Sequence, residues 1–262
     1  MLIYRILSSL VLAPLALGVV WLGPPWVAGM AALGAAVMGW EWARLCRARR
    51  FGVVGALVVL SAVAAIGVAA TGAYLLSLGV AMTGALAVWA LGRLGGEREA
   101  PWTAIGTLWI ALPCVALVWL SRDPDIGRVT IIWIFVLVWV VDTCAYAAGR
   151  GIGGPLLAPR LSPKKTWAGL LGGMAGAAVI GYAASRLVGP PAAAMAMLCV
   201  GLAIVEQMGD LAESFAKRHF GVKDASDLIP GHGGLLDRLD GMLVVLPAVA
   251  IVELLEGNPL QW

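Results

Sequence analysis

Residues 129–148, VTIIWIFVLVWVVDTCAYAA, form an apolar stretch that is long enough to cross a lipid bilayer as a helix. About 20 helical residues extend about 30 Å, which matches the thickness of the hydrocarbon layer. Asp142 is the one acidic or basic side chain in the stretch. A charge at membrane depth is costly and usually faces a partner or a wet cavity. The stretch therefore predicts a membrane-spanning helix and nominates Asp142 for a functional site.

Comparable apolar stretches recur along the whole chain. Hydrophobic residues make up 61% of the 262 residues and charged residues only 13%, whereas charged residues are roughly a quarter of ordinary soluble domains. A backbone in lipid must satisfy its own hydrogen bonds, and the 34 glycines allow helices to pack closely there. We therefore predict an all-α, polytopic membrane helical bundle with about nine transmembrane helices. They are expected near residues 6–22, 25–41, 52–70, 72–93, 102–120, 129–148, 167–187, 191–208 and 241–255.

The basic residues predict the orientation of this bundle. If the helices alternate in direction, only Arg122, Arg128 and Arg186 of the 18 Lys and Arg fall on one side. The positive-inside rule then places the N-terminus and the opposite, strongly basic face in the cytoplasm. The first stretch lacks an Ala-x-Ala cleavage pattern, so we expect a retained span. A net charge of only +3 implies no nucleic-acid partner, and the clustered bases suit lipid headgroups or nucleotide phosphates.

Polar residues divide the chain into two parts. Residues 1–100 carry almost no polar groups inside their apolar stretches, so we interpret them as N-terminal scaffold helices. Residues 101–262 contain Asp142, the basic loop 149–166 and the polar segment 209–240, and are expected to carry the catalytic site. The four cysteines show no metal-binding spacing, so we expect small packing residues without a disulfide.

At the start of the polar segment, three side chains that could take part in catalysis are expected on one helical face. Asp210, Ser214 and Lys217 are spaced i, i+4 and i+7, which brings a carboxylate, a hydroxyl and an ammonium to one side of a helix. The alternative interpretation is the solvated end of an amphipathic helix, with Asp210 and Lys217 paired through neighbours.

A glycine-rich loop follows. Glycines on both sides of His232 allow positive φ angles, and backbone N–H groups there can form a nest for phosphate oxygens. Asp237 and Asp240 then stand three apart at a predicted helix start. Two carboxylates near a triphosphate suggest Mg²⁺, which shares phosphate oxygens with few protein ligands. A simple helix cap is the alternative for this Asp pair.

The loop before residue 167 attracts anions. Lys164 and Lys165 lie beside a helix start that Thr166 can cap. Juxtamembrane lysines that only obey the positive-inside rule are the alternative interpretation. Asp142, with Tyr146 one turn on and Arg150 beyond, points to the same face, although a buried Asp–Arg pair would explain it equally well.

These motifs together resemble the phosphatidate cytidylyltransferase family. Similarity covers about residues 140–240, with departures at Cys144 and at Ala168, where Glu or Gln often follows the Trp. The upstream motifs are Asp142-Thr143, Ala145-Tyr146, Gly149-Arg150 and Ser162-Pro163-Lys164-Lys165-Thr166-Trp167. The C-terminal signature comprises Ser214, Lys217-Arg218, Lys223-Asp224, Ser226, Pro230, His232-Gly233-Gly234, Asp237-Arg238 and Asp240.

The resemblance implies a dimeric, multi-spanning enzyme of the bacterial inner membrane. Such an enzyme transfers a cytidylyl group from CTP to phosphatidic acid and gives CDP-diacylglycerol and pyrophosphate. A polytopic transporter and another membrane phosphotransferase are the alternatives.

On this basis we assign roles to residues. We expect Mg²⁺ at Asp210 and Asp237, with Asp240 and Asp142 as additional ligands. Whether a second, monovalent or divalent cation also binds is left open. The catalytic set is Asp210, Asp237, Lys217, Asp240 and His232. The substrate-binding set is Ser214, Arg218, Lys223, Asp224, Gly233, Gly234, Arg238, Ser162, Lys164, Lys165, Thr166 and Tyr146.

Overall fold

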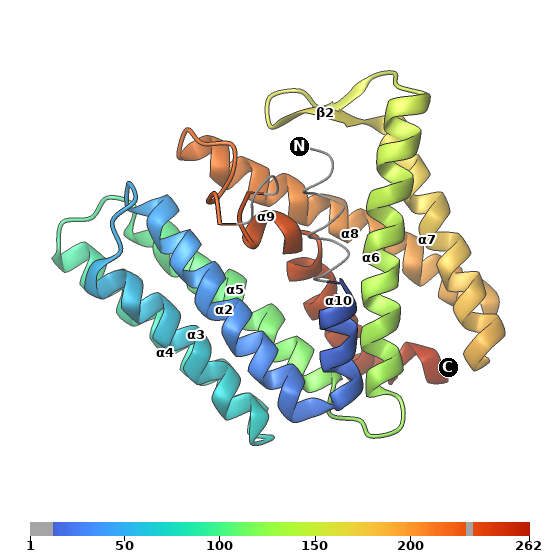
Figure 1. The fold of residues 1–262 in the computed structure, drawn as a ribbon, viewed down its shortest axis with the longest axis horizontal. Coiled ribbons are helices and arrows are strands. Elements are labelled where there is room, and N and C mark those ends of the chain that lie inside the picture. Colours follow the sequence, from blue (N-terminus) through green and yellow to red (C-terminus); the bar gives the residue numbers. More distant parts are fainter. Residues whose placement is uncertain (1–12, 229–232) are drawn as a thin grey trace. The chain divides into compact units, whose positions relative to one another are not determined.

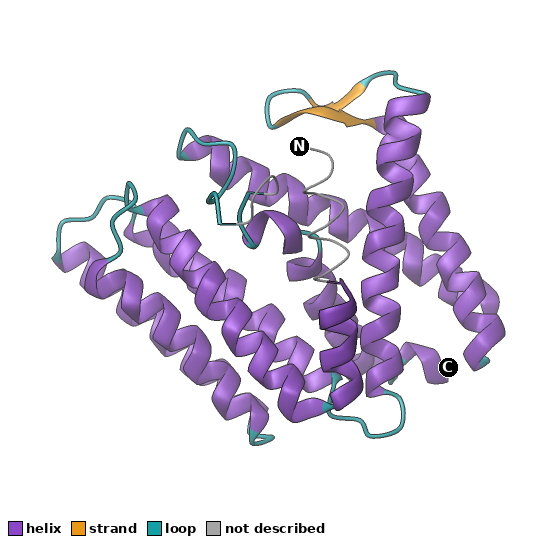
Figure 2. Cartoon of the chain, viewed as in Figure 1, coloured by secondary structure: helices purple, strands orange, loops and turns teal. Residues whose placement is uncertain are grey.

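The structure, a computed structural model, describes residues 13–228 and 233–262, and their regular structure is almost entirely helical (Figures 1 and 2). This confirms the predicted all-α class. The long helices are α2 (Pro24–Cys46), α3 (Gly52–Ala70), α4 (Tyr74–Leu94), α5 (Ala100–Leu120), α6 (Gly127–Gly151), α7 (Trp167–Val188) and α8 (Ala192–His219). The shorter elements are β1 (Leu156–Ala158), β2 (Ser162–Thr166), α9 (Leu236–Leu239), α10 (Met242–Glu256) and the 3₁₀ helix η1 (Pro259–Gln261).

Within the described residues, six helices, α3 to α8, are long and apolar enough to cross a membrane. They coincide with six of the nine predicted spans, so the chain is a membrane-type helical protein. The predicted span 25–41 forms part of α2, but Pro, Trp and Glu41 lower the hydropathy of this helix. The predicted span 241–255 forms α10, whose 15 residues extend only about 22 Å. The span 6–22 begins outside the described residues.

The chain packs as two compact units. The first comprises Met1–Arg128 and His219–Leu239, and the second comprises Val129–Arg218 and Asp240–Trp262. The polar C-terminal segment is therefore shared between the units. The predicted division into scaffold helices at 1–100 and a catalytic part at 101–262 was based on polar groups and not on packing. These packing units do not test it, so it stays a prediction.

Small residues let the helices of the first unit approach one another. α2 packs against α3 and α5, and α3 also packs against α4 and α5. A side chain at Gly39 would meet Val59 at 3.2 Å. Gly106 of α5 leaves room for the indole of Trp42, whose Nε1 donates to the carbonyl of Trp102 at 2.9 Å. Close packing of this kind is typical of membrane helices.

The second unit uses glycines in the same way. A side chain at Gly173 of α7 would meet Val141 of α6 at 3.1 Å. Gly176 leaves space for the side chain of Cys144, so this departure from the family pattern is accommodated locally. The four cysteines are free, as predicted.

The loop before α7 contains a short hairpin that the sequence analysis did not predict. β1 and β2 pair antiparallel, with Leu156 opposite Thr166 and Ala158 opposite Ser162 (Figure 2). Thr166 then caps α7 as predicted, because its Oγ1 accepts a hydrogen bond from Gly169 N at 3.0 Å.

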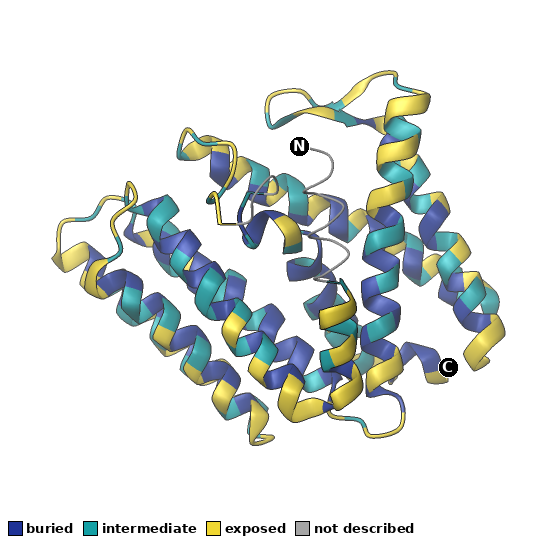
Figure 3. Ribbon diagram, viewed as in Figure 1, coloured by how far each residue is buried: buried dark blue, intermediate teal, exposed yellow. Residues whose placement is uncertain are grey.

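Large apolar side chains remain exposed along the spanning helices. Leu86 of α4 is 59% exposed and Val179 of α7 is 65% exposed, and Figure 3 shows exposed positions along both helices. Because such side chains are stable in contact with lipid, their exposure supports a membrane environment for these helices.

Candidate active site

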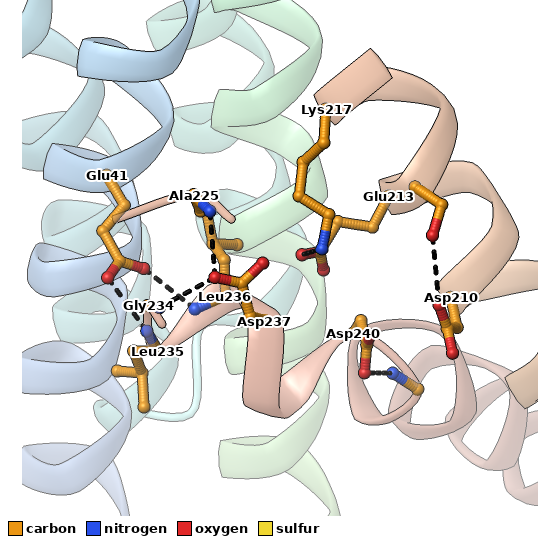
Figure 4. Close-up of polar contacts among 12 residues, drawn as sticks. Glu41, Asp210, Glu213, Lys217, Ala225, Gly234, Leu235, Leu236, Asp237 and Asp240 are labelled. Carbon is orange, nitrogen blue, oxygen red and sulfur yellow. Dashed lines mark hydrogen bonds and ion pairs between the residues drawn. The ribbon is translucent and has the colours of Figure 1, made fainter. Parts of the chain in front are cut away.

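The C-terminal third of α8 carries the predicted polar face (Figure 4). Ser214 Oγ donates to Asp210 Oδ1 at 3.4 Å. Lys217 Nζ donates to Glu213 Oε1 at 3.0 Å, and both of these side chains are buried. A buried charge is tolerated mainly when it is paired. The pairing of Lys217 with a neighbouring side chain agrees with the alternative interpretation, but the burial of Lys217 shows that this helix end is not simply solvated.

The hairpin lies against this face of α8. Lys165 of β2 forms an ion pair with Asp210. Arg218 Nε donates to the carbonyl of Leu161, between the two strands, at 3.4 Å. Lys164 is exposed. Two motifs that are 45 positions apart in the sequence thus meet, and Lys165 rather than Lys164 is the lysine at the site.

Several further carboxyl groups surround the Lys165–Asp210 pair. The Asp142 carboxyl of α6 lies within hydrogen-bonding reach of Glu206 of α8, and both Lys165 and Asp210 are close enough to act on Glu206 electrostatically. Glu206 is 5% exposed. Asp142 is itself exposed, so a buried Asp–Arg pair does not describe it. The second unit therefore gathers acids and a lysine where α6, α8 and the hairpin meet.

Asp240, just before α10, belongs to the same acidic group. Its Oδ1 accepts a hydrogen bond from Gly241 N at 2.9 Å (Figure 4). Partial burial and the nearby carboxylates of Asp210, Glu213 and Asp142 raise the pKa of Asp240 well above its ordinary value. A carboxyl group that loses its proton so reluctantly would be relieved by a cation.

In the first unit, Asp237 organises the glycine-rich loop. Its Oδ2 accepts hydrogen bonds from Ala225 N at 2.9 Å and from Gly234 N at 2.7 Å (Figure 4). Both of these donors precede Asp237 in the sequence, whereas the donors of a helix N-cap follow it. Gly233 has φ +80°, and a side chain there would lie 2.8 Å from Asp237 Oδ2. The glycines thus make room for a carboxylate of the protein itself.

A second carboxylate, Glu41 of α2, holds the same loop. Its Oε1 accepts from Ser226 Oγ at 2.6 Å and from Leu235 N at 2.9 Å, and its Oε2 accepts from Leu236 N at 2.8 Å. Glu41 is 0% exposed. The N–H groups of Gly234, Leu235 and Leu236 therefore donate to carboxylates of the protein, and the phosphate nest at the glycines around His232 stays a prediction.

The remaining predicted residues are distributed as follows. His232 lies outside the described residues. Ser162 is half-buried in the hairpin. Lys164, Lys223, Asp224, Arg238 and Tyr146 are exposed. Exposure leaves their roles in binding as predictions.

The predicted metal ligands fall into both units. Asp142, Asp210 and Asp240 belong to the second unit and Asp237 to the first. Within residues 13–228 and 233–262, no three Asp, Glu, His or Cys side chains are grouped so that they could hold a metal ion by themselves. A shared ion between Asp210 and Asp237 stays a prediction.

The sequence analysis missed Glu41 and Glu206 as members of these clusters. Both lie inside or at the end of predicted spans, at 25–41 and 191–208. The criterion that selected Asp142, an ionisable side chain at membrane depth, applies to both. It would have found them had it been applied to every span.

The fold defines a membrane-type helical protein, and each of its two units contains a cluster of polar and charged side chains. A sequence model of the Cytidylyltransferase family matches residues 3–255, and the chain belongs to this family. The phosphatidate cytidylyltransferase of Brucella suis biovar 1 is 36% identical over 271 residues, covering 97% of this chain and 94% of the relative. That of Pseudomonas aeruginosa is 35% identical over 272 residues, covering 95% of this chain and 96% of the relative.

Proposed function

We propose that this chain is a phosphatidate cytidylyltransferase, which makes CDP-diacylglycerol and pyrophosphate from CTP and phosphatidic acid. Membership of the Cytidylyltransferase family over residues 3–255, with relatives of that name along nearly the full length, carries this conclusion. The helices that are suited to lipid agree with a lipid substrate. The same comparisons disfavour the transporter and the other phosphotransferases that the sequence left open.

The reaction needs charge neutralisation more than proton transfer. An oxygen of the phosphatidic acid phosphate attacks the α-phosphorus of CTP, a new P–O bond forms, and the bond to the β-phosphate oxygen breaks. Pyrophosphate leaves with the electron pair of that bond. Because the lipid phosphate is already ionised, no strong general base is required. Cationic side chains aimed at the phosphates lower the barrier, and Lys165, Lys217, Arg218 and Lys223 are the candidates.

We propose Mg²⁺ as the cofactor. The donors suit it, since they are carboxylate oxygens, and Mg²⁺ takes one or two protein carboxylates together with substrate phosphates and water. Asp210 and Asp237 would hold the ion, and Asp240 and Asp142 would serve as additional ligands. A bound Mg²⁺ would neutralise phosphate charge. The pairing of Lys165 with Asp210 shows that this carboxylate already accepts a cationic partner.

The cellular setting is proposed on the same basis. Bacterial relatives and six apolar helices favour a multi-pass protein of the bacterial inner membrane. The distribution of Lys and Arg favours a cytoplasmic N-terminus and active site. A homodimer rests on the family resemblance alone.

The direct test is incubation of the purified protein in detergent with radiolabelled CTP, phosphatidic acid and Mg²⁺. We expect a labelled lipid and one pyrophosphate per lipid formed, and neither when phosphatidic acid is omitted. Labelling from ATP in place of CTP would indicate a kinase instead. Failure to form labelled lipid under any of these conditions would overturn the proposed function.

A further inference from the structure

Glu41 lies in residues 1–100, which were expected to be scaffold. It is completely buried, and it contacts the glycine-rich loop that precedes Asp237. The loop donor Leu236 is 195 positions away in the sequence. Burial of a lone carboxylate is costly unless its oxygens are hydrogen-bonded. Among the described residues, Glu41 meets this condition through the loop donors Ser226, Leu235 and Leu236. The Glu41 side chain is therefore suited to hold the loop rather than to pack α2 against its neighbouring helices.

Glu41 and Asp237 divide the loop donors between them in an alternating pattern. At the start of the loop, Ala225 donates to Asp237 and Ser226 donates to Glu41. At the end of the loop, Gly234 donates to Asp237 and the next two residues donate to Glu41. Each carboxylate thus joins both ends of the loop, Glu41 from α2 and Asp237 from within the segment itself. Figure 4 shows both contacts of Asp237 and the contacts of Glu41 with Leu235 and Leu236.

The glycines fit this arrangement. A side chain at Gly234 would lie 2.6 Å from Glu41 Oε1, and one at Gly233 would lie 2.8 Å from Asp237 Oδ2. Neither carboxylate could keep its place if these positions carried side chains. Glu41 therefore fixes the backbone of the two residues that directly precede Asp237.

We propose that Glu41 is a positioning residue: it holds the loop at Ser226, Leu235 and Leu236 so that Asp237 is presented to the nucleotide and its metal ion. The inference rests on the proposed function for its kinetic consequence, but the ordering of the loop by Glu41 can be measured without turnover. Loss of Glu41 should loosen residues 225–239 and weaken CTP binding, and leave the chemical step of the bound complex largely intact.

The test is Glu41→Gln, purified in detergent beside the wild type. Gln has one acceptor oxygen instead of two, so Leu235 N or Leu236 N must lose its acceptor. Hydrogen bonds to charged groups contribute about 1.5–3 kcal/mol, so we expect amide hydrogen exchange in 225–239 to rise about tenfold or more. The KM for CTP should rise by a similar factor, with kcat within about twofold of wild type.

Glu97→Gln is the matched control. Glu97 belongs to the same unit and is paired with Arg47, with Nη2 2.6 Å from Oε1, but none of its described contacts is with the loop. It undergoes the same chemical change, and we expect wild-type exchange in 225–239 and a wild-type KM. If Glu41→Gln behaves like Glu97→Gln in both measurements, the proposal is wrong. It is equally wrong if Glu41→Gln raises exchange evenly across the first unit and lowers the melting temperature without changing the KM.

Ser226→Ala decides the question should Glu41→Gln fail to fold. It removes one of the three donors and leaves the carboxylate in place. We expect an increase of about threefold in exchange near residue 226 and in the KM for CTP, because a neutral hydrogen bond is worth about 1 kcal/mol. No change in either quantity would refute the proposal. If the wild type makes no labelled lipid but the variants still exchange faster than the wild type near the loop, the proposed function is refuted and the ordering of the loop by Glu41 still stands.

Discussion

In the first unit, Glu41 and Asp237 accept hydrogen bonds from backbone N–H groups and a hydroxyl. In the second unit, Asp142, Glu206 and Asp210 face one another and Lys165. The first kind of environment stabilises a carboxylate without any counter-charge. The second leaves carboxylates close to other carboxylates, where a cation would be favourable. Glu and Asp side chains thus order a loop in the first unit, whereas in the second unit they gather around a lysine.

Asp237 belongs to both descriptions, which makes it the most informative position in the comparison. It orders the loop as Glu41 does, but it is also a proposed metal ligand. If it only ordered the loop, removal of its charge would affect binding more than turnover. If it holds Mg²⁺, the chemical step itself should suffer.

The largest expected effect is that of Asp237→Asn. Asn keeps one acceptor oxygen for the loop amides, so the protein should fold in detergent. Turnover at saturating CTP and Mg²⁺ should fall about a thousandfold, since removal of a group that stabilises transition-state charge costs about 10²–10³. Formation of labelled CDP-diacylglycerol measures it. Wild-type turnover would show that Asp237 orders the loop only, and would contradict the metal assignment.

The next effect concerns the buried pair of α8. Glu213→Gln removes the negative charge that lies 3.0 Å from the buried Lys217 Nζ. Breaking a buried ion pair from one side typically costs about 3–5 kcal/mol, and we expect a loss of about 3 kcal/mol in the free energy of unfolding. Thermal unfolding in detergent measures this loss. A melting temperature equal to that of wild type would show that Lys217 does not depend on Glu213.

The two adjacent lysines of the hairpin offer a matched pair. Lys165 contacts Asp210 and Lys164 is exposed. We expect Lys165→Met to raise the KM for CTP about tenfold, as expected from the loss of one charge-assisted contact, and Lys164→Met to change it less than about twofold. Steady-state kinetics with both variants decides the matter. Equal effects would mean that the lysines act through general positive charge at the membrane surface.

The long helices could be predicted from the sequence because the length of an apolar stretch directly reflects the thickness of a bilayer. The face that carries Asp210 and Ser214 could be predicted because helical periodicity relates residues that are four positions apart. The cap at Thr166 needed only local sequence as well. α10 is helical as predicted, but its 15 residues are fewer than those of α3 to α8, so a crossing at 241–255 stays a prediction.

Contacts between distant segments could not be predicted in the same way. Nothing in the spacing of Glu41 relates it to Leu236, and the glycine-rich loop was interpreted as a nest for phosphate rather than for carboxylates of the protein. The choice of Lys165 over Lys164 depends on the hairpin. Its strands of three and five residues are too short for the alternation of polarity to be recognised.

The smallest expected effect, that of Asp240→Asn, tests the acids of the second unit. Because burial and neighbouring carboxylates raise the pKa of Asp240 in the folded protein, the charged form is less favourable there than in the unfolded chain. Asp240 therefore lowers stability as the pH rises above about 3.9, the ordinary pKa of Asp, toward its raised value in the folded protein. Without divalent ions, Asp240→Asn should raise the melting temperature by about 2–4 °C at pH 7.5. The gain should vanish near pH 4, where both proteins carry a neutral side chain.

Glu256→Gln, at the exposed end of α10, is the matched control and should leave the melting temperature unchanged at both pH values. Differential scanning fluorimetry in detergent measures all three proteins. Added Mg²⁺ should narrow the gap between wild type and Asp240→Asn, since a cation relieves the repulsion that the variant has already removed. A variant that melts below wild type at pH 7.5 would mean that the Asp240 carboxylate is stabilised by its surroundings. The contrast between the acids of the two units would then fail at this position.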